Sequence, residues 1–247
     1  MEYELRPFWS RFFTLDEKFG LFLILIVCVP RFLLVLQANV VGNYSAIGMI
    51  MIASATAPFL FLTRYGQEKI GIIKPKRYDQ LMIGFFIGLL FSFLLFYIGK
   101  IFFGNTYQNW YNYIGRSYQI SPRLNGHDKA ILFAVMASTG MVFSPVGEEL
   151  FFRGIVHASF TKYLGDKKSS LIDSSAFALT HISHFGLVYI TGVWKLLFLP
   201  TLIWVAAMFL VSMIFFRIKK QSGSIWGAVI CHAGFNLGMI YCIFYLL

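Results

Sequence analysis

No charged side chain interrupts residues 81–99, which read LMIGFFIGLLFSFLLFYIG. A helix that crosses the hydrocarbon core of a bilayer needs about 20 predominantly apolar residues, and this stretch has that length. The rest of the chain agrees, because 58% of its 247 residues are hydrophobic and 13% are charged, whereas a soluble domain carries about a quarter charged residues. The composition excludes a soluble or disordered protein and predicts an integral membrane protein.

Other stretches with little charge predict further membrane-spanning helices, two before residues 81–99 and four after them. We expect an all-α, polytopic transmembrane bundle of seven to eight spans. The predicted spans are residues 19–36, 45–63, 81–99, 130–147, 170–190, 196–216 and 222–247. A polar loop at about 104–128 divides the chain into an N-terminal region, 1–128, with three spans plus this loop, and a core, 129–247, with four spans.

Basic residues concentrate in the loops on one side of the predicted bundle. The formal net charge is +10 at pH 7, but the 21 Lys and Arg residues lie mainly between apolar runs. They are therefore interpreted as topology signals and lipid-headgroup contacts, with no nucleic-acid partner. Because basic loops stay on the cytoplasmic side, we predict a protein of the cell membrane with a cytoplasmic amino terminus and an outer carboxyl terminus.

Ionisable side chains inside apolar spans usually face a protein interior or a water-filled cavity. The stretch SPVGEELFFRGIVH, residues 144–157, places Glu149 and Arg153 four residues apart. These two side chains share a helix face and are expected to form an ion pair. Glu148 is rotated by about 100° from Glu149 on an ideal helix, which leaves its carboxylate free to accept a proton from water.

Two later spans carry histidines at a similar depth. FALTH ends at His181, and HAGFN places His232 and Asn236 four residues apart on one helix face. With a rise of about 1.5 Å per residue, Glu148, His181 and His232 lie roughly 22, 18 and 15 Å from the cytoplasmic ends of their helices. This agreement predicts one polar cavity inside the membrane, open toward the cytoplasm.

The three motifs, in this order, resemble a known family. EELFFR fits an EExxxR motif, FALTH an FxxxH motif and HAGFN an HxxxN motif. This set is similar to that of the CAAX-protease and bacteriocin-processing (CPBP, or Abi) intramembrane proteases, which include the type II CAAX prenyl endopeptidases. The resemblance covers about residues 130–247 and does not extend to residues 1–128.

This resemblance implies an intramembrane endopeptidase that acts on a membrane-associated peptide or protein. The substrate could be a prenylated C-terminal peptide or a pheromone or bacteriocin precursor. Glu148 and His181 would activate a water molecule. His232 and Asn236 would form the oxyanion hole. The ion pair between Glu149 and Arg153 would hold the Glu148 helix in place. The implied catalytic set is Glu148, Glu149, Arg153, His181, His232 and Asn236.

Metal dependence has two interpretations. Two histidines and a glutamate form the ligand set of zinc hydrolases, so zinc would be held by Glu148, His181 and His232. The chain contains no HExxH motif, and a glutamate-activated water also acts without a metal. We favour the metal-free mechanism, with no cofactor.

Two non-enzymatic functions stay open: an immunity or scaffold protein that only binds through the cavity, and a transporter, whose usual internal symmetry the sequence lacks. The sequence does not determine the oligomeric state.

Arg31, beside Pro30, either extends its side chain to the membrane interface or pairs with a buried acid. Asp173 either orients His181 through a neighbour or caps the start of the fifth helix, and we favour the cap. His157 is either a hydrogen-bond partner or a headgroup contact, and His184 either replaces an Asn found in some family members or is interfacial.

Overall fold

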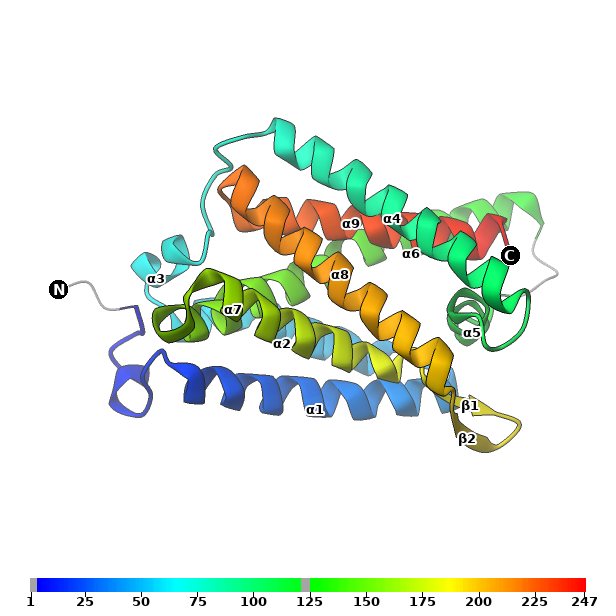
Figure 1. The fold of residues 1–247 in the computed structure, drawn as a ribbon, viewed down its shortest axis with the longest axis horizontal. Coiled ribbons are helices and arrows are strands. Elements are labelled where there is room, and N and C mark those ends of the chain that lie inside the picture. Colours follow the sequence, from blue (N-terminus) through cyan, green and yellow to red (C-terminus); the bar gives the residue numbers. More distant parts are fainter. Residues whose placement is uncertain (1–3, 121–124) are drawn as a thin grey trace.

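The computed structural model describes residues 4–120 and 125–247, which form a bundle of helices with one β-hairpin (Figure 1). The elements are η1 Trp9–Arg11, α1 Glu17–Val41, α2 Ser45–Phe61, α3 Arg64–Lys69, α4 Asp79–Phe103, α5 Trp110–Ser117, α6 Gly126–Glu149, η2 Leu150–Val156, α7 His157–Thr180, η3 His181–Ser183, β1 Leu187–Ile190, β2 Val193–Leu196, α8 Phe198–Ser222 and α9 Ile225–Tyr245. Among the described residues, five helical segments are long and apolar enough to cross a membrane, and α2 is apolar but shorter. The predicted helical membrane bundle is confirmed.

Local sequence signals set the ends of α1. The Asp16 side chain accepts a hydrogen bond from the Phe19 backbone N–H at 3.0 Å, as an N-cap residue does. Gly42, with φ of 69°, ends the helix in a left-handed conformation that favours glycine. Pro30 lies inside α1 without ending it, and α1 extends beyond the predicted residues 19–36 at both ends.

Helical turns run from α6 through η2, a π-helical segment, into the first turns of α7. Gly165, with φ of 72° and ψ of 165°, then turns the chain back. Single π-helical turns occur frequently at functional sites, because the wider turn redirects side chains. Here the π-helical segment begins directly after the two adjacent glutamates of the EExxxR motif.

The predicted fifth span, 170–190, is wrong after Ser183, where the helical turns of η3 end. α7 ends at Thr180, and β1 pairs antiparallel with β2, with Leu187 opposite Leu196. Gly186, with φ of 134°, and Gly192, with φ of 82°, adopt backbone conformations that favour glycine and turn the chain into and around the hairpin. A short apolar run is compatible with either helix or strand until its partner is known.

The predicted polar loop also differs from expectation, because it contains the helix α5. Asn109 begins this helix by accepting a hydrogen bond from the Tyr111 backbone N–H at 3.0 Å. Trp110 and Tyr111 are buried, which anchors α5 against the bundle. Residues 121–124 of the predicted loop lie outside the described residues.

α9 lies inside the bundle and contacts α4, α6 and α8, while α1, α2 and α7 lie together on one side (Figure 1). α4 and α9 approach closely because glycines line their interface. A Cβ atom on Gly88 would lie 2.0 Å from the Cys231 carbonyl oxygen, and one on Gly234 would lie 2.1 Å from the Phe85 carbonyl oxygen. Small residues permit such close contact between membrane helices.

Gly88→Leu is expected to destabilise the protein by about 1–3 kcal/mol or more, because the added side chain must push the α4 and α9 backbones apart. Thermal unfolding in mild detergent measures the effect. Gly48→Leu is the matched control, since a Cβ at Gly48 in α2 has no heavy atom within 4 Å. An unchanged melting temperature for Gly88→Leu would contradict the close contact between α4 and α9.

The two ends of the bundle differ in the loops that they carry (Figure 1). The basic end consists of residues 4–18, 62–78, 161–168 and 217–224. The hairpin end consists of residues 42–44, 104–120, 186–197 and the carboxyl terminus. α1, α4 and α9 run from the basic end to the hairpin end, whereas α2, α6 and α8 run in the opposite direction.

Candidate active site

Four of the six predicted catalytic residues border one cavity of about 190 Å³ inside the bundle. Glu148 comes from the last turn of α6, His181 follows α7 directly, and His232 and Asn236 lie on one face of α9. The single polar cavity expected from the three motifs is therefore present. Arg31 and His184 border it too, and apolar side chains such as those of Met51, Met208 and Phe235 form much of the remaining wall.

Glu148 is not the free carboxylate that the sequence predicted. Its Oε1 atom accepts hydrogen bonds from Arg31 Nη2 at 2.8 Å and from Ser144 Oγ at 2.6 Å. Arg31 and Glu148 are both buried, at 3% and 2% exposed. A buried carboxylate and guanidinium compensate each other's charge when they meet in this way. Arg31 is thus the partner of a buried acid, one of the two predicted alternatives.

The second oxygen of Glu148 faces His181. The distance from Glu148 Oε2 to His181 Nε2 is 3.9 Å, and Oε2 has no hydrogen-bond partner among the described residues. His181 Nδ1 lies 2.7 Å from the Phe177 carbonyl oxygen. Because a carbonyl oxygen only accepts, Nδ1 carries the proton and Nε2 presents a lone pair. Two acceptor atoms therefore converge at a separation that suits one water molecule donating to both.

Glu149 and Arg153 form the ion pair that their spacing predicted, behind the cavity wall. Arg153 Nε lies 3.1 Å from Glu149 Oε2, and both side chains are completely buried. Arg153 Nη2 also donates to Ser212 Oγ at 2.6 Å, and its guanidinium lies 4.4 Å from the centre of the Phe177 ring. These contacts fix the arginine between η2, α7 and α8.

His232 is oriented by the same carboxylate. Its Nδ1 atom lies 2.8 Å from Glu149 Oε1, and its ring stacks on Phe215 with a centroid distance of 4.6 Å. Because the carboxylate accepts the Nδ1 proton, only Nε2 is left for other partners. Asn236 donates from Nδ2 to the Gly140 carbonyl oxygen at 2.9 Å, which leaves its second amide hydrogen.

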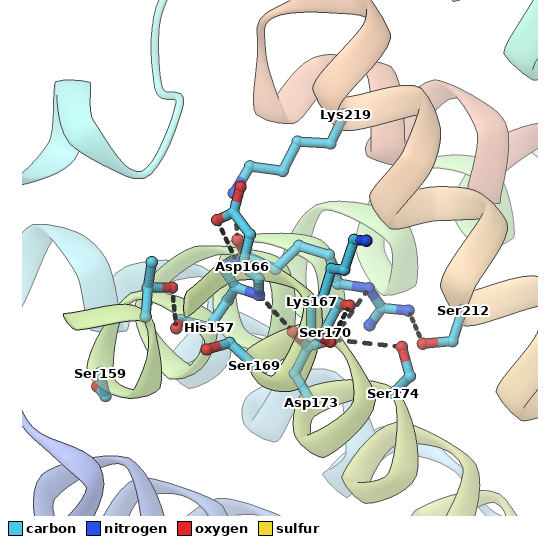
Figure 2. Close-up of polar contacts among 12 residues, drawn as sticks. His157, Ser159, Asp166, Lys167, Ser169, Ser170, Asp173, Ser174, Ser212 and Lys219 are labelled. Atoms are coloured by element: carbon cyan, nitrogen blue, oxygen red, sulfur yellow. Dashed lines mark hydrogen bonds and ion pairs between the residues drawn. The ribbon is translucent and has the colours of Figure 1, made fainter. Parts of the chain in front are cut away.

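A further polar cluster contains His157, Asp173 and Lys219 (Figure 2). His157 Nδ1 lies 2.7 Å from Asp173 Oδ2, and Arg153 Nε lies 4.0 Å from Asp173 Oδ1. Lys219 Nζ donates to the Arg153 carbonyl oxygen at 2.5 Å. Asp173 is thus in the interior of α7 and does not cap it, which corrects the prediction. His157 is the hydrogen-bond partner of a buried carboxylate rather than a headgroup contact.

His184 borders the cavity, with its ring centroid 5.4 Å from that of His181. It follows η3, at the point where the chain leaves the helix and approaches the hairpin. This position places it beside the predicted catalytic histidine, inside the protein. Both predicted alternatives for His184 stay open, and no contact among the described residues assigns it a chemical role.

A known protein family matches the part of the chain that contains these residues. Residues 130–238 match the family model described as Rce1-like, type II CAAX prenyl endopeptidase. This part of the chain is therefore similar to the Rce1-like family. The matched segment contains all three motifs and the six predicted catalytic residues, and the match supports a protease of the CAAX type. No curated protein and no solved structure matches the chain.

A zinc ion does not fit the polar groups of the Rce1-like segment well. Zinc would need Glu148, His181 and His232 as ligands, but the Arg31 guanidinium already lies 2.8 Å from the Glu148 carboxylate, and a cation there opposes a second cation. Within residues 4–120 and 125–247, no group of three or more His, Cys, Asp or Glu side chains is arranged to hold a metal.

Arg31 is the site residue whose role sequence reasoning left undecided. It lies in α1, outside the Rce1-like segment, and its partner Glu148 is 117 residues away. The available signal was a lone arginine in an apolar span, because such a charge usually faces a buried partner. Ser144 and Ser212 were missed entirely, since serines in apolar helices carry no such signal.

Proposed function

We propose that this protein hydrolyses a peptide bond with a water molecule held between Glu148 and His181. The observation that carries the proposal is the convergence of Glu148 Oε2 and His181 Nε2, 3.9 Å apart, on one buried cavity within an Rce1-like segment. A base that attacks through water must lie within hydrogen-bond reach of that water, and both atoms meet this condition. The substrate is a membrane-associated peptide or protein.

In the proposed reaction, the water oxygen forms a bond to the carbonyl carbon and its proton passes to Glu148. The carbonyl electrons move to the oxygen, which accepts hydrogen bonds from the free amide hydrogen of Asn236 and from a protonated His232 Nε2. When the carbonyl bond re-forms, the C–N bond breaks and Glu148 returns the proton to the leaving amine. Glu149 and Arg153 do not touch the substrate and act as positioning residues for His232 and for the helix of Glu148.

We propose that the reaction needs no metal. The Arg31–Glu148 ion pair supports this choice, because it supplies the positive charge that a zinc ion would otherwise bring to the carboxylate. Purified protein is expected to cleave members of a quenched-fluorescence peptide library in mild detergent, with the same initial rate after prolonged chelation. Metal analysis of the active sample accompanies the assay. A rate that falls on chelation and returns with added zinc would contradict the metal-free mechanism.

A second candidate function is a protein that only binds through this cavity. The ion pair between Arg31 and Glu148 is the observation that favours it, because a compensated carboxylate is a weaker base than a free one. In that case Glu148→Gln would keep the biological effect of the protein. No cleavage of any library peptide by well-folded protein would favour this candidate over hydrolysis.

Arg31→Met is expected to lower kcat by about a hundredfold, because Glu148 loses the contact that fixes its orientation, and small displacements of a catalytic group are this costly. KM should change little if Arg31 does not touch the substrate. Arg31→Lys keeps a cation in α1 and is expected to recover folding stability but only part of kcat, since an ammonium lacks the planar guanidinium fork. Steady-state kinetics and melting temperatures, measured on both variants, separate positioning from folding. Wild-type kcat in Arg31→Met would contradict the positioning role.

A further inference from the structure

The basic end of the bundle contains a cavity of about 710 Å³, which is larger than the catalytic one. The two cavities share no lining residue, so the proposed hydrolysis does not use this space. Its walls come mainly from α3 and the loop after it, from the first turns of α7, and from the end of α8 with the short link to α9. A cavity of this size that is built from separate parts of the chain is a candidate ligand site.

Hydrogen bonds join two of these parts into one wall. The Ile225 backbone N–H donates to the Gly71 carbonyl oxygen at 2.8 Å, and Ser224 Oγ donates to the Ile73 carbonyl oxygen at 2.6 Å. The loop after α3 is thereby fixed against the link between α8 and α9. Both of these helices are long and apolar enough to cross a membrane, so the link between them, residues 223–224, lies at the level of the lipid headgroups.

Three carboxylates border the cavity, and each of them already has a basic partner. The ion pairs are Glu4 with Lys69 at 2.8 Å, Glu68 with Arg64 at 3.4 Å, and Asp166 with Lys220. The acidic side chains of the lining are therefore compensated, and every further lysine there adds net positive charge.

Lys162 and Lys219 supply this net charge, because neither forms an ion pair within residues 4–120 and 125–247. Lys219 Nζ donates to the Arg153 carbonyl oxygen at 2.5 Å, which leaves two of its three hydrogens for other acceptors. Lys162 Nζ lies 5.6 Å from the centre of the Tyr163 ring. Figure 2 shows the Lys219 side chain extending from α8 toward α7, the helix that carries Lys162. Two ammonium groups from different helices thus border one cavity and have donors to spare.

The lining favours a phosphate group over a planar carboxylate. Arginine, whose fork matches a carboxylate, is absent from the described lining, whereas lysine binds phosphate as a point charge. Apolar side chains, among them those of Leu15, Ile70 and Phe216, form part of the wall. A phosphate group with a short apolar attachment therefore complements this cavity in both charge and polarity.

We propose that the basic-end cavity binds a phosphate-bearing anion, with Lys162 and Lys219 as its charged contacts. Two sources supply this chemistry, the headgroup of an anionic phospholipid and a free phosphate ion, and the same ammonium groups contact the phosphate in both cases. Basic pockets between membrane helices recognise lipid headgroups in this way. The site does not depend on the proposed hydrolysis, and its test needs no peptide substrate.

Calorimetric titration of the whole chain in mild neutral detergent tests the site. The probes are short-chain phosphatidylglycerol, which is anionic, short-chain phosphatidylcholine, which has no net charge, and inorganic phosphate. We expect saturable binding of phosphatidylglycerol and much weaker binding of phosphatidylcholine. If inorganic phosphate binds too, the phosphate group alone is sufficient; if only phosphatidylglycerol binds, the ligand is a lipid headgroup. Equal binding of the two lipids, or no binding of either anion, would overturn the proposal.

Substitutions then locate the binding in the cavity. Lys162→Met and Lys219→Met are each expected to raise the Kd for phosphatidylglycerol about fivefold, the loss typical of one basic residue at a lipid surface. Ala158→Phe places a ring in the cavity without a change of charge, because Ala158 belongs to the lining, and should weaken binding as well. Lys168→Met is the matched control, since Lys168 is an exposed lysine of α7 outside the lining.

Melting temperatures separate loss of binding from loss of folding in these variants. Lys162 is exposed, so Lys162→Met is expected to fold normally and decides the question even if Lys219→Met, which loses its contact with the Arg153 carbonyl oxygen, is unstable. Wild-type affinity in folded Lys162→Met or folded Ala158→Phe would overturn the proposal. An equal loss of affinity in Lys168→Met would also overturn it, because the anion would then respond to surface charge in general.

Discussion

Glu148→Gln is expected to abolish most peptide hydrolysis, with kcat lower by about 10²–10⁴-fold, the usual contribution of a positioned general base. The amide keeps the shape of the side chain and can still accept hydrogen bonds from Arg31 and Ser144, but it cannot take a proton from water. KM should stay close to the wild-type value, because the cavity keeps its shape. The measurement is a progress curve with a cleavable fluorogenic peptide.

Loss of activity in this variant must be separated from loss of folding. Glu148→Gln leaves the buried Arg31 guanidinium without a counter-charge, and breaking a buried ion pair costs about 3–5 kcal/mol. The Arg31→Met/Glu148→Gln double variant removes both charges and is expected to regain stability while it stays inactive. Glu68→Gln serves as the surface control, since Glu68 pairs with Arg64 outside the site. More than a tenth of wild-type activity in a folded Glu148→Gln protein would refute its role as the base.

Arg153→Met is expected to lower the free energy of unfolding by about 3–5 kcal/mol, because it leaves Glu149 charged and uncompensated in the interior. Arg153 has no exposure and contacts Glu149 and Ser212 from η2. The variant should also be expressed poorly. Unfolding free energies from a denaturant titration in mild detergent measure the effect.

The matched control uses a second arginine with a glutamate four residues away. Arg64 Nε lies 3.4 Å from Glu68 Oε1 at the protein surface, and exposed pairs contribute about 0–1 kcal/mol. Arg64→Met should therefore change the free energy of unfolding by less than about 1 kcal/mol. The Glu149→Gln/Arg153→Met double variant should recover part of the loss, because it removes both charges. Equal effects of Arg64→Met and Arg153→Met would contradict the structural role of the buried pair.

Membrane-spanning helices were predictable from sequence because the absence of charge along a helix is a local property. Residues 81–99 lie within α4, and residues 45–63 overlap α2 almost completely. The hairpin at 187–196 was not predictable in the same way. Its apolar residues suit a helix, and only the pairing of β1 with β2, together with two glycines at positive φ, selects the strand.

Part of the candidate site was predictable because motif spacing fixes helix faces. The four-residue spacings of Glu149 with Arg153 and of His232 with Asn236 placed each pair correctly. The partner of Glu148 was not predictable, because the contact with Arg31 joins two helices far apart in sequence.

Arg31 also limits how the chain can be divided. It belongs to α1, whereas the carboxylate that it neutralises belongs to the Rce1-like segment. In a fragment truncated to that segment, the Glu148 carboxylate would lie within the bilayer without its Arg31 partner and without water to solvate it. We therefore expect that the shortest fragment able to carry out the proposed hydrolysis must include α1, either in the same chain or supplied as a separate polypeptide.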